Sequence, residues 1–451
     1  MQKTIKYLRE LEAFIDEGQE LKILTLISRI HPDDIADLLD SLEEDKRLKL
    51  FRLLDVETAS DVIMEMGEIS RDLILEDISP ERLTQIVDDM PSDDAADLIG
   101  DLPDEQAQDI LQKIDKEKSR EVQRLLEYPE DSAGGIMQTE LISAIRDATV
   151  KETIELIREF SEGVEDLHNV FVINKNSQLV GILPLRKLIL AKEDTSIENI
   201  MDPSVIYATA DMDQEEVAGI FRKYDMISLP VVDNDMHILG RILFDDILDV
   251  IEEEDSEDIF RMAGISEEED IVYSGATLQV CMTRLPWLAF ILFGTLLSGY
   301  FLWLYQSTLT ELLALITFVP VICAMSGNVG VQSTSIVIRG LAIGKIDFLN
   351  LRKLVAKELA VGTLIGLVCA VVGGLIGYIW HHNMVLGISI FLAMFITIAF
   401  AALVGIVTPL LFKKIKIDPA VASGALVTTT ADIIAINIYF ILAAFLMKVL
   451  V

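Results

Sequence analysis

From residue 285 onward the hydrophobic positions run together in long stretches instead of alternating with polar ones. A hydrocarbon core about 30 Å thick requires about 20 apolar residues of helix to cross it. The pattern therefore predicts a carboxyl-terminal domain, residues 285–451, built as a five-helix transmembrane bundle. The predicted spans are residues 285–305, 312–338, 354–380, 385–412 and 420–447.

Residues 1–128 show a different pattern, with apolar positions at helical spacing in segments of about ten residues. Several segments begin where proline adjoins Asp, Glu or Ser, as at Pro32, Pro80 and Pro91, and acids and proline suit the first turn of a helix. We expect an acidic, all-α helical solenoid in the cytosol.

Residues 170–190 and 229–249 repeat each other at an offset of 59 residues. Each copy reads strand, polar turn, strand, helix, and helices are predicted before them at 150–160 and 214–224. The repeat resembles the tandem cystathionine-β-synthase (CBS) domain, a pair of α/β units that bind adenine nucleotides or act as sensors. The expected domains are residues 129–199 for the first repeat and 200–244 for the second.

Residues 245–284 are predicted to form an acidic connector helix and a linker to the first span. Acids occupy nearly every face of 245–258, and like charges four residues apart destabilise a helix unless they are screened or bridged. A solvated run of charge remains open as an explanation. The position between a sensor and the first span favours a ligand-dependent element.

Charge divides along the same line as hydropathy. Residues 1–280 carry 27 Lys and Arg against 68 Asp and Glu, whereas residues 281–451 carry 10 against 5. So much negative charge in the soluble half repels itself and favours a cation as ligand, not a nucleic acid. The chain shows no P-loop and no catalytic-triad spacing, so no enzyme is expected, and its three cysteines form no CxxC pair.

Lys and Arg gather between the second and third stretches and between the fourth and fifth, while the alternate loops have none. By the positive-inside rule this predicts a multi-pass protein of the plasma membrane with its amino terminus in the cytoplasm and its carboxyl terminus outside. The amino terminus has no apolar signal-peptide core.

Asp432 lies near the middle of the fifth stretch, with Thr428–Thr430 before it and Asn437 after it. An ionisable residue at this depth is costly and is read as functional, although a structural hydrogen-bonding role stays open. Glu311, Glu358 and Asp418 lie at span edges, and Asp418 also suits an N-cap before Pro419 at the start of the fifth helix.

The second stretch contains Pro320 followed by the polar, glycine-rich run 326–334. Irregular backbone at membrane depth is tolerated where it lines a cavity, so we expect an interruption here. Carbonyls, amides and hydroxyls would offer oxygen ligands for a hard cation.

The order of these segments, over essentially the whole chain, resembles the MgtE family of magnesium channels. Local strings agree: residues 128–137 (YPEDSAGGIM), 327–332 (GNVGVQ), 339–342 (RGLA), 418–420 (DPA) and 428–432 (TTTAD). One departure is Ser423–Gly424–Ala425, where the family commonly has proline after the small pair.

The resemblance implies a homodimer in the lipid bilayer that imports Mg²⁺ down its electrochemical gradient, with Asp432 of each subunit facing a hydrated ion. Asn328, Gly330 and Gln332 would line or shape the pathway, and Glu311, Glu358 and Asp418 are further pathway candidates. ATP at the repeats is an optional ligand. Inhibitory Mg²⁺ between the cytosolic domains would be held by Asp93, Asp97, Asp213, Glu215, Asp225, Asp246, Asp249, Glu254, Glu257 and Asp258.

The expected mechanism is negative feedback, in which plentiful cytosolic Mg²⁺ bridges the acidic surfaces and closes the pore. An ion-coupled secondary transporter of Mg²⁺ or Co²⁺ would have the same topology and is the main alternative. An intramembrane aspartyl protease would need two acids at membrane depth, and a nucleotide-sensing membrane regulator would bind ATP without ion flux.

Overall fold

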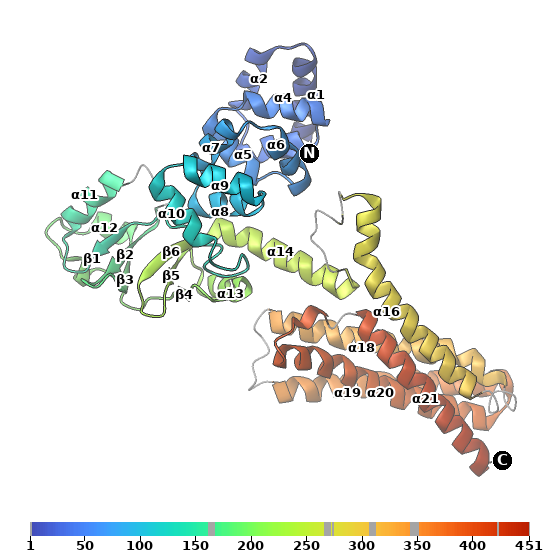
Figure 1. The fold of residues 1–451 in the computed structure, drawn as a ribbon. Coiled ribbons are helices and arrows are strands. Elements are labelled where there is room, and N and C mark those ends of the chain that lie inside the picture. Colours follow the sequence, from blue (N-terminus) through green and yellow to red (C-terminus); the bar gives the residue numbers. More distant parts are fainter. Residues whose placement is uncertain are drawn as a thin grey trace. The chain divides into compact units, whose positions relative to one another are not determined.

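The computed structural model describes residues 2–160, 167–265, 272, 275–305, 313–342, 351–421 and 424–450. Their contacts divide the chain into two compact units, Met1–Glu252 and Glu253–Val451. Figure 1 shows the first unit as short helices and small sheets and the second as long helices. The predicted multidomain membrane architecture is confirmed.

The amino-terminal part of the first unit is a series of ten short helices, which confirms the helical domain. Some of their starts carry a side-chain cap: Asp55 accepts a hydrogen bond from the Thr58 amide at 2.9 Å, and Ser79 caps the helix that begins at Pro80. The helices are α1 (Gln2–Asp16), α2 (Glu20–Ile27), α3 (Pro32–Asp40), α4 (Glu44–Leu53), α5 (Val56–Met64), α6 (Glu68–Asp77), α7 (Pro80–Asp89), α8 (Ser92–Gly100), α9 (Asp104–Lys113) and α10 (Lys116–Leu125).

Two three-stranded sheets follow, ordered β1-β2-β3 and β4-β5-β6, each with one parallel and one antiparallel pair. Equivalent positions of the repeats meet, because Asn169 donates to Ser228 at 3.1 Å. The strands are β1 (Ser143–Ile145), β2 (Asn169–Ile173), β3 (Leu179–Pro184), β4 (Ala208–Thr209), β5 (Ser228–Val232) and β6 (Ile238–Leu243), with helices α11 (Val150–Phe160), α12 (Leu185–Leu190) and α13 (Gln214–Tyr224).

The segment 128–138 joins the helical domain to the second repeat. The Ala133 amide donates to the Met212 carbonyl at 2.7 Å, and the Gln138 amide donates to the Arg241 carbonyl at 2.7 Å. A Cβ atom on Gly135 would lie 2.4 Å from the Pro129 carbonyl oxygen, so only glycine fits this turn. The junction therefore fixes the end of the helical domain against the repeats.

Helix α14 (Phe244–Ala263) is the predicted acidic connector, and it continues past the boundary between the two units. Its first half buries Ile247 and Val250 in the first unit. The remaining positions are largely acidic and half-buried or exposed. One helix thus contributes residues to both units.

The described residues of the second unit form five helices long and apolar enough to span a membrane, which confirms the predicted bundle. Helix α20 packs against α18, α19 and α21, while α16 packs against α21. The helices are α16 (Thr277–Leu304), α18 (Val319–Ala342), α19 (Leu351–His381), α20 (Met384–Lys414) and α21 (Gly424–Leu450), with 3-10 turns η3 (Leu313–Phe318) and η4 (Pro419–Val421).

The predicted interruption after Pro320 was wrong, because α18 is continuous from Val319 to Ala342. Pro320 is the second residue of the helix, where no amide donor is required, and the irregular turn η3 comes before it. The glycines serve close packing instead: a Cβ on Gly405 of α20 would lie 2.3 Å from the Gly330 carbonyl oxygen.

Candidate ion pathway and acidic regulatory sites

Asp432 of α21 lines a cavity of about 240 Å³ in the second unit. Helix α16 contributes Thr295 and Ser298 to its wall, and α18 contributes Cys323. Thr429 lies on the same wall as Asp432, one turn earlier in α21. The cavity is therefore lined by hydroxyls, a thiol and a carboxylate within otherwise apolar helices.

The Asp432 carboxylate has spare capacity to bind. Its Oδ1 atom is buried and has no hydrogen-bond partner among the described residues, while the Cys323 thiol lies within hydrogen-bonding distance of the carboxylate. A buried carboxylate oxygen without a partner is costly in an apolar setting, so a cation or its water shell would stabilise it. Asn437, further along α21, does not serve as that partner: its side-chain oxygen accepts a hydrogen bond from the Tyr305 hydroxyl at 3.3 Å.

The other predicted pathway residues fall in different settings. Asn328 and Gln332 are exposed one turn apart on α18, whereas Gly330 is buried and its carbonyl accepts a 3.0 Å hydrogen bond from Thr334. Glu358 of α19 is only 7% exposed. Asp418 caps η4 by accepting from the Ala420 amide at 2.8 Å, so it does not start α21 directly as expected. Glu311 lies outside the described residues.

In the first unit, a buried group of carboxylates joins α8 to the start of α14. Burial raises the pKa of Asp93 well above its usual value, and the neighbouring Asp94 and Asp246 raise it further. Burial, followed by Asp246 and Asp97, raises the pKa of Asp94 to about 7. The Asp93 Oδ1 atom has no hydrogen-bond partner in the described chain.

Asp246 reaches this group from the first turn of α14, where it also accepts a 3.1 Å hydrogen bond from the Leu243 amide. Burial raises the pKa of Asp246 to about 6. The start of α8 is held near Asp246 by Glu140. Ser92, the first residue of α8, donates to Glu140 at 2.6 Å, and Lys118 pairs with Glu140 at 3.0 Å. The family resemblance predicted Asp93, Asp97 and Asp246 but missed Asp94.

A second acidic group lies further along α14. Burial raises the pKa of Glu65, which ends α5, and the charges of Asp33 and Asp249 raise it further. Burial also raises the pKa of Asp249, with Asp33 among its acidic neighbours. Asp249 was predicted, whereas Glu65 and Asp33 were not, because no local spacing indicates that α3 and α5 lie near α14.

The predicted regulatory residues of the second repeat lie at the two ends of α13. Asp213 caps its start by accepting from the Glu215 amide at 2.9 Å. Asp225 ends the helix in the left-handed conformation with φ of 51°, which Asp tolerates better than most residues. The structure therefore does not bring Asp213 and Asp225 together.

In the second unit, the later half of α14 forms ion pairs with the membrane domain. Asp255 pairs with Arg339 at the end of α18 at 2.7 Å. Arg261 lies between two carboxylates and pairs with both Glu257 and Asp418. The predicted regulatory residue Glu257 and the predicted pathway residue Asp418 thus share one cation.

Asp258 belongs to the same charged network. Burial raises its pKa to about 6, and the nearby carboxylates of Asp418 and Glu254 raise it further. The network therefore combines attraction through Arg261 with repulsion among acids that are close together. An added divalent cation would relieve that repulsion.

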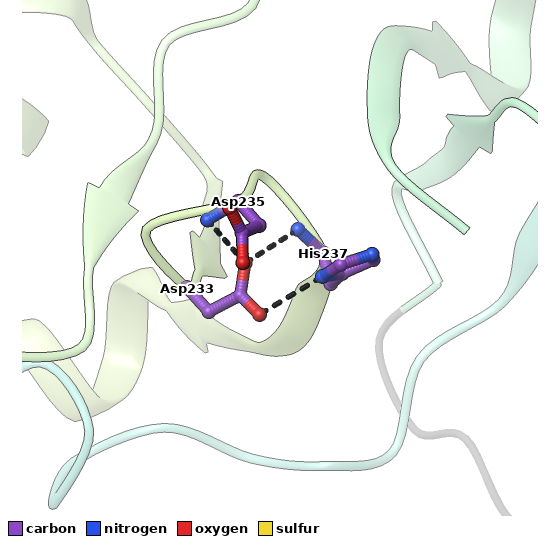
Figure 2. Close-up of side chains that lie close together, drawn as sticks. All are labelled: Asp233, Asp235 and His237. Carbon is purple, nitrogen blue, oxygen red and sulfur yellow. Dashed lines mark hydrogen bonds and ion pairs between the residues drawn. The ribbon is translucent and has the colours of Figure 1, made fainter. Parts of the chain in front are cut away.

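A group of possible metal ligands, Asp233, Asp235 and His237, occupies the turn between β5 and β6 (Figure 2). Asp233 accepts hydrogen bonds from the Asp235 amide at 2.9 Å and the His237 amide at 2.8 Å. In the matching turn of the first repeat, the side-chain oxygen of the neutral Asn174 accepts the same pair of bonds from the Asn176 and Gln178 amides. The group is thus explained by turn formation.

A second cavity, of about 430 Å³, lies between the 128–138 junction and the second repeat. Tyr128 and Pro129 line it from the junction, and Thr209, Asp211 and Asp213 line it from the repeat. Aromatic, hydroxyl and carboxylate groups around such a volume can accept a small polar ligand.

Three family models match the chain, one of them twice. The MgtE intracellular N domain matches residues 30–131, the CBS domain matches residues 133–194 and 197–253, and the MgtE divalent cation transporter matches residues 319–442. Together they extend over both structural units.

Among similar proteins, Magnesium transporter MgtE of Thermus thermophilus is 32% identical over 97% of this chain and 98% of its own length. Magnesium transporter MgtE of Bacillus subtilis is 32% identical over 94% of both chains. A crystal structure of the cytosolic domain of the Mg²⁺ channel MgtE in complex with ATP matches 54% of this chain with a TM-score of 0.52 and 32% identity. The chain belongs to the MgtE family of divalent cation transporters.

Proposed function

We propose that this chain forms a magnesium channel of the plasma membrane that imports Mg²⁺ down its electrochemical gradient. The unpartnered carboxylate of Asp432, in a cavity among membrane-spanning helices, is the observation that carries this proposal. Mg²⁺ gives up its water reluctantly and is held by one or two carboxylates through those waters. The full-length relatives named as magnesium transporters support the choice of ion.

We further propose a homodimer with the amino terminus in the cytoplasm and the carboxyl terminus outside. Two-fold symmetry would place two copies of Asp432 around one ion. The exposed face of α18 that carries Asn328 and Gln332 would then face the pathway. The clusters of Lys and Arg between alternate spans support the orientation.

Closure by cytosolic Mg²⁺ is the regulatory part of the proposal. The acids around Asp93, Asp94 and Asp246 are buried without enough positive charge nearby, as their raised pKa values indicate. A bound cation would stabilise this compact arrangement selectively, and only such differential binding can shift a conformational equilibrium. Loss of Mg²⁺ would leave the carboxylates to repel one another and free α14 to move.

ATP is a second proposed ligand of the cytosolic part. The 430 Å³ cavity at the second repeat supports it, as does the similar cytosolic domain of an Mg²⁺ channel MgtE that was crystallised in complex with ATP. Nucleotide bound there would contact the junction at Tyr128 and would thereby stabilise the attachment of the helical domain.

Mg²⁺ uptake by purified protein in liposomes tests the pathway. We expect Asp432→Asn, which keeps the shape and removes the charge, to reduce uptake by tenfold or more, because a hydrogen bond from the ion's water shell to a charged group contributes about 1.5–3 kcal/mol. Asp104→Asn is the matched control, since Asp104 is exposed at the start of α9. Full uptake by Asp432→Asn would remove this residue from the pathway.

The same liposomes separate a channel from an ion-coupled transporter of Mg²⁺ or Co²⁺. A channel conducts with equal pH and equal Na⁺ on both sides, driven only by the Mg²⁺ gradient and the membrane potential. Uptake that required a proton or Na⁺ gradient would favour the coupled mechanism. Deleting residues 1–128 should relieve Mg²⁺ inhibition if the helical domain holds the inhibitory ion.

A further inference from the structure

We propose that the Cys323 thiolate and the Asp432 carboxylate together bind a thiophilic divalent cation, such as Cd²⁺ or Zn²⁺, and that the bound ion blocks the pathway. The block rests on the proposed function, whereas the binding does not. The two side chains come from different helices, α18 and α21, and line the same 240 Å³ cavity.

The geometry suits a shared ion. The Cys323 thiol lies within hydrogen-bonding distance of the Asp432 carboxylate, and the Asp432 Oδ1 atom is buried with no hydrogen-bond partner among the described residues. The Cys323 sulfur is thus already close to the Asp432 carboxylate, and the Asp432 Oδ1 atom is available to bind an ion. Thr429 and Ser298 add hydroxyls to the same wall.

The other cysteines lack these neighbours. Cys369 of α19 is half-buried against an apolar cluster, and Cys281 is exposed near the start of α16. Neither lines the cavity around Asp432. The combination of a thiol, a carboxylate and a water-sized space is therefore found at Cys323.

The chemistry separates this role from that of a magnesium site. Mg²⁺ prefers oxygen ligands and retains its waters, so the thiol contributes little to its binding. Zn²⁺ and Cd²⁺ bind thiolate strongly. On binding, the S–H bond breaks, a sulfur–metal bond forms and the proton passes to water, with no change of oxidation state. Water molecules complete the coordination.

Block follows from the strength of this binding. Ion conduction requires a site that is strong enough to admit the ion and weak enough to release it. A thiophilic ion held by both sulfur and carboxylate would leave slowly and exclude Mg²⁺ from Asp432. The pathway would therefore be inhibited by Cd²⁺ at concentrations far below those of Mg²⁺.

The first test measures Mg²⁺ uptake into liposomes across a Cd²⁺ series, with full-length protein in a Cys281→Ser background that removes the exposed thiol. We expect Cys323→Ser to raise the half-inhibitory Cd²⁺ concentration about tenfold or more relative to its own uninhibited uptake, equivalent to about 1.4 kcal/mol. Cys369→Ser is the matched control and should keep the parent sensitivity. Equal sensitivity of Cys323→Ser and its parent would overturn the proposal.

The second test detects binding without any transport, through the ultraviolet charge-transfer band of a cadmium–thiolate bond in detergent-solubilised protein. The band should form in the Cys281→Ser parent and in Cys369→Ser, be lost in Cys323→Ser, and need more Cd²⁺ in Asp432→Asn. A Cys323-dependent band in protein that transports no Mg²⁺ would preserve the site and reject the proposed function. Mg²⁺ uptake with no such band would reject the Cys323–Asp432 site and preserve the proposed function.

Discussion

Asp94 shows how one carboxylate can make the folded state sensitive to pH. Burial and the nearby Asp246 raise its pKa to about 7, from a usual value near 4. Between these values the folded state holds a proton that the unfolded state has lost. Stability in the absence of Mg²⁺ should therefore fall as pH rises from about 4 to about 7.

The first prediction is that Asp94→Asn stabilises Mg²⁺-free protein at pH 7.5, by a few kcal/mol at most, since one pKa unit corresponds to about 1.4 kcal/mol. The gain should shrink toward pH 5, where the wild-type carboxyl is protonated in the folded state. Thermal melting at the two pH values with a chelator measures it. The exposed Asp104→Asn serves as control, and an equal effect of Asp94→Asn at both pH values would contradict the prediction.

At the residue scale, sequence reasoning found groups whose context is local. Asp432 was identifiable because a charge within a long apolar stretch is visible in the sequence. Asp94, Glu65 and Asp33 were not, since their importance depends on helices α3, α5 and α8 lying near α14. That proximity arises from tertiary packing, which helical periodicity does not encode.

At the scale of elements, Arg261 attaches the later half of α14 to the membrane domain. Its guanidinium pairs with Glu257 and Asp418, and both partners in the Asp418 pair are 33% exposed. The Asp255–Arg339 pair is 51% and 57% exposed. Exposed pairs contribute little to stability, so the two attachments should differ in strength.

The second prediction is that Arg261→Gln raises the Mg²⁺ concentration needed for half-inhibition of uptake by about threefold or more, equivalent to at least about 0.7 kcal/mol. Without this cation, the acids around Asp258 repel α14 from Asp418, and more Mg²⁺ is required to replace it. Arg339→Gln is the matched substitution in the exposed pair and should have a smaller effect. A larger shift for Arg339→Gln than for Arg261→Gln would show that the Asp255–Arg339 pair is the stronger attachment, which contradicts the prediction.

Most elements were predictable because each has a local signal. The five spans follow from hydropathy, and the helices at 150–160 and 214–224 were placed at the residues where α11 and α13 occur. The glycine-rich run of α18 was mistaken for an interruption. Its glycines instead allow α20 and α21 to pack closely, as the contact between Gly330 and Gly405 shows, and sequence alone cannot distinguish these uses of glycine.

At the scale of the whole molecule, the dominant feature is the excess of acidic charge before residue 281. Monovalent salt screens such charge over about 8–10 Å at physiological ionic strength. A divalent ion can also bridge two carboxylates. The two effects are separable by experiment.

The third prediction is that Mg²⁺ slows hydrogen exchange of the backbone amides in residues 245–258 of the full-length protein. NaCl at matched ionic strength should slow it much less, because bridging and not screening stabilises this helix. Mass spectrometry of peptides from α14 measures the rates, with peptides from α7, whose Ile86 and Val87 are fully buried, as the control. Equal protection by the two salts would favour simple screening.

The continuity of α14 has a consequence for helical phase. A helix of 20 residues is about 30 Å long and turns by about 100° at each residue. The angle between Asp246 and Arg261 around its axis is therefore fixed by the number of residues between them. One added or deleted residue near Glu252 would change that angle by about 100°. Length, as well as charge, must be preserved in this segment.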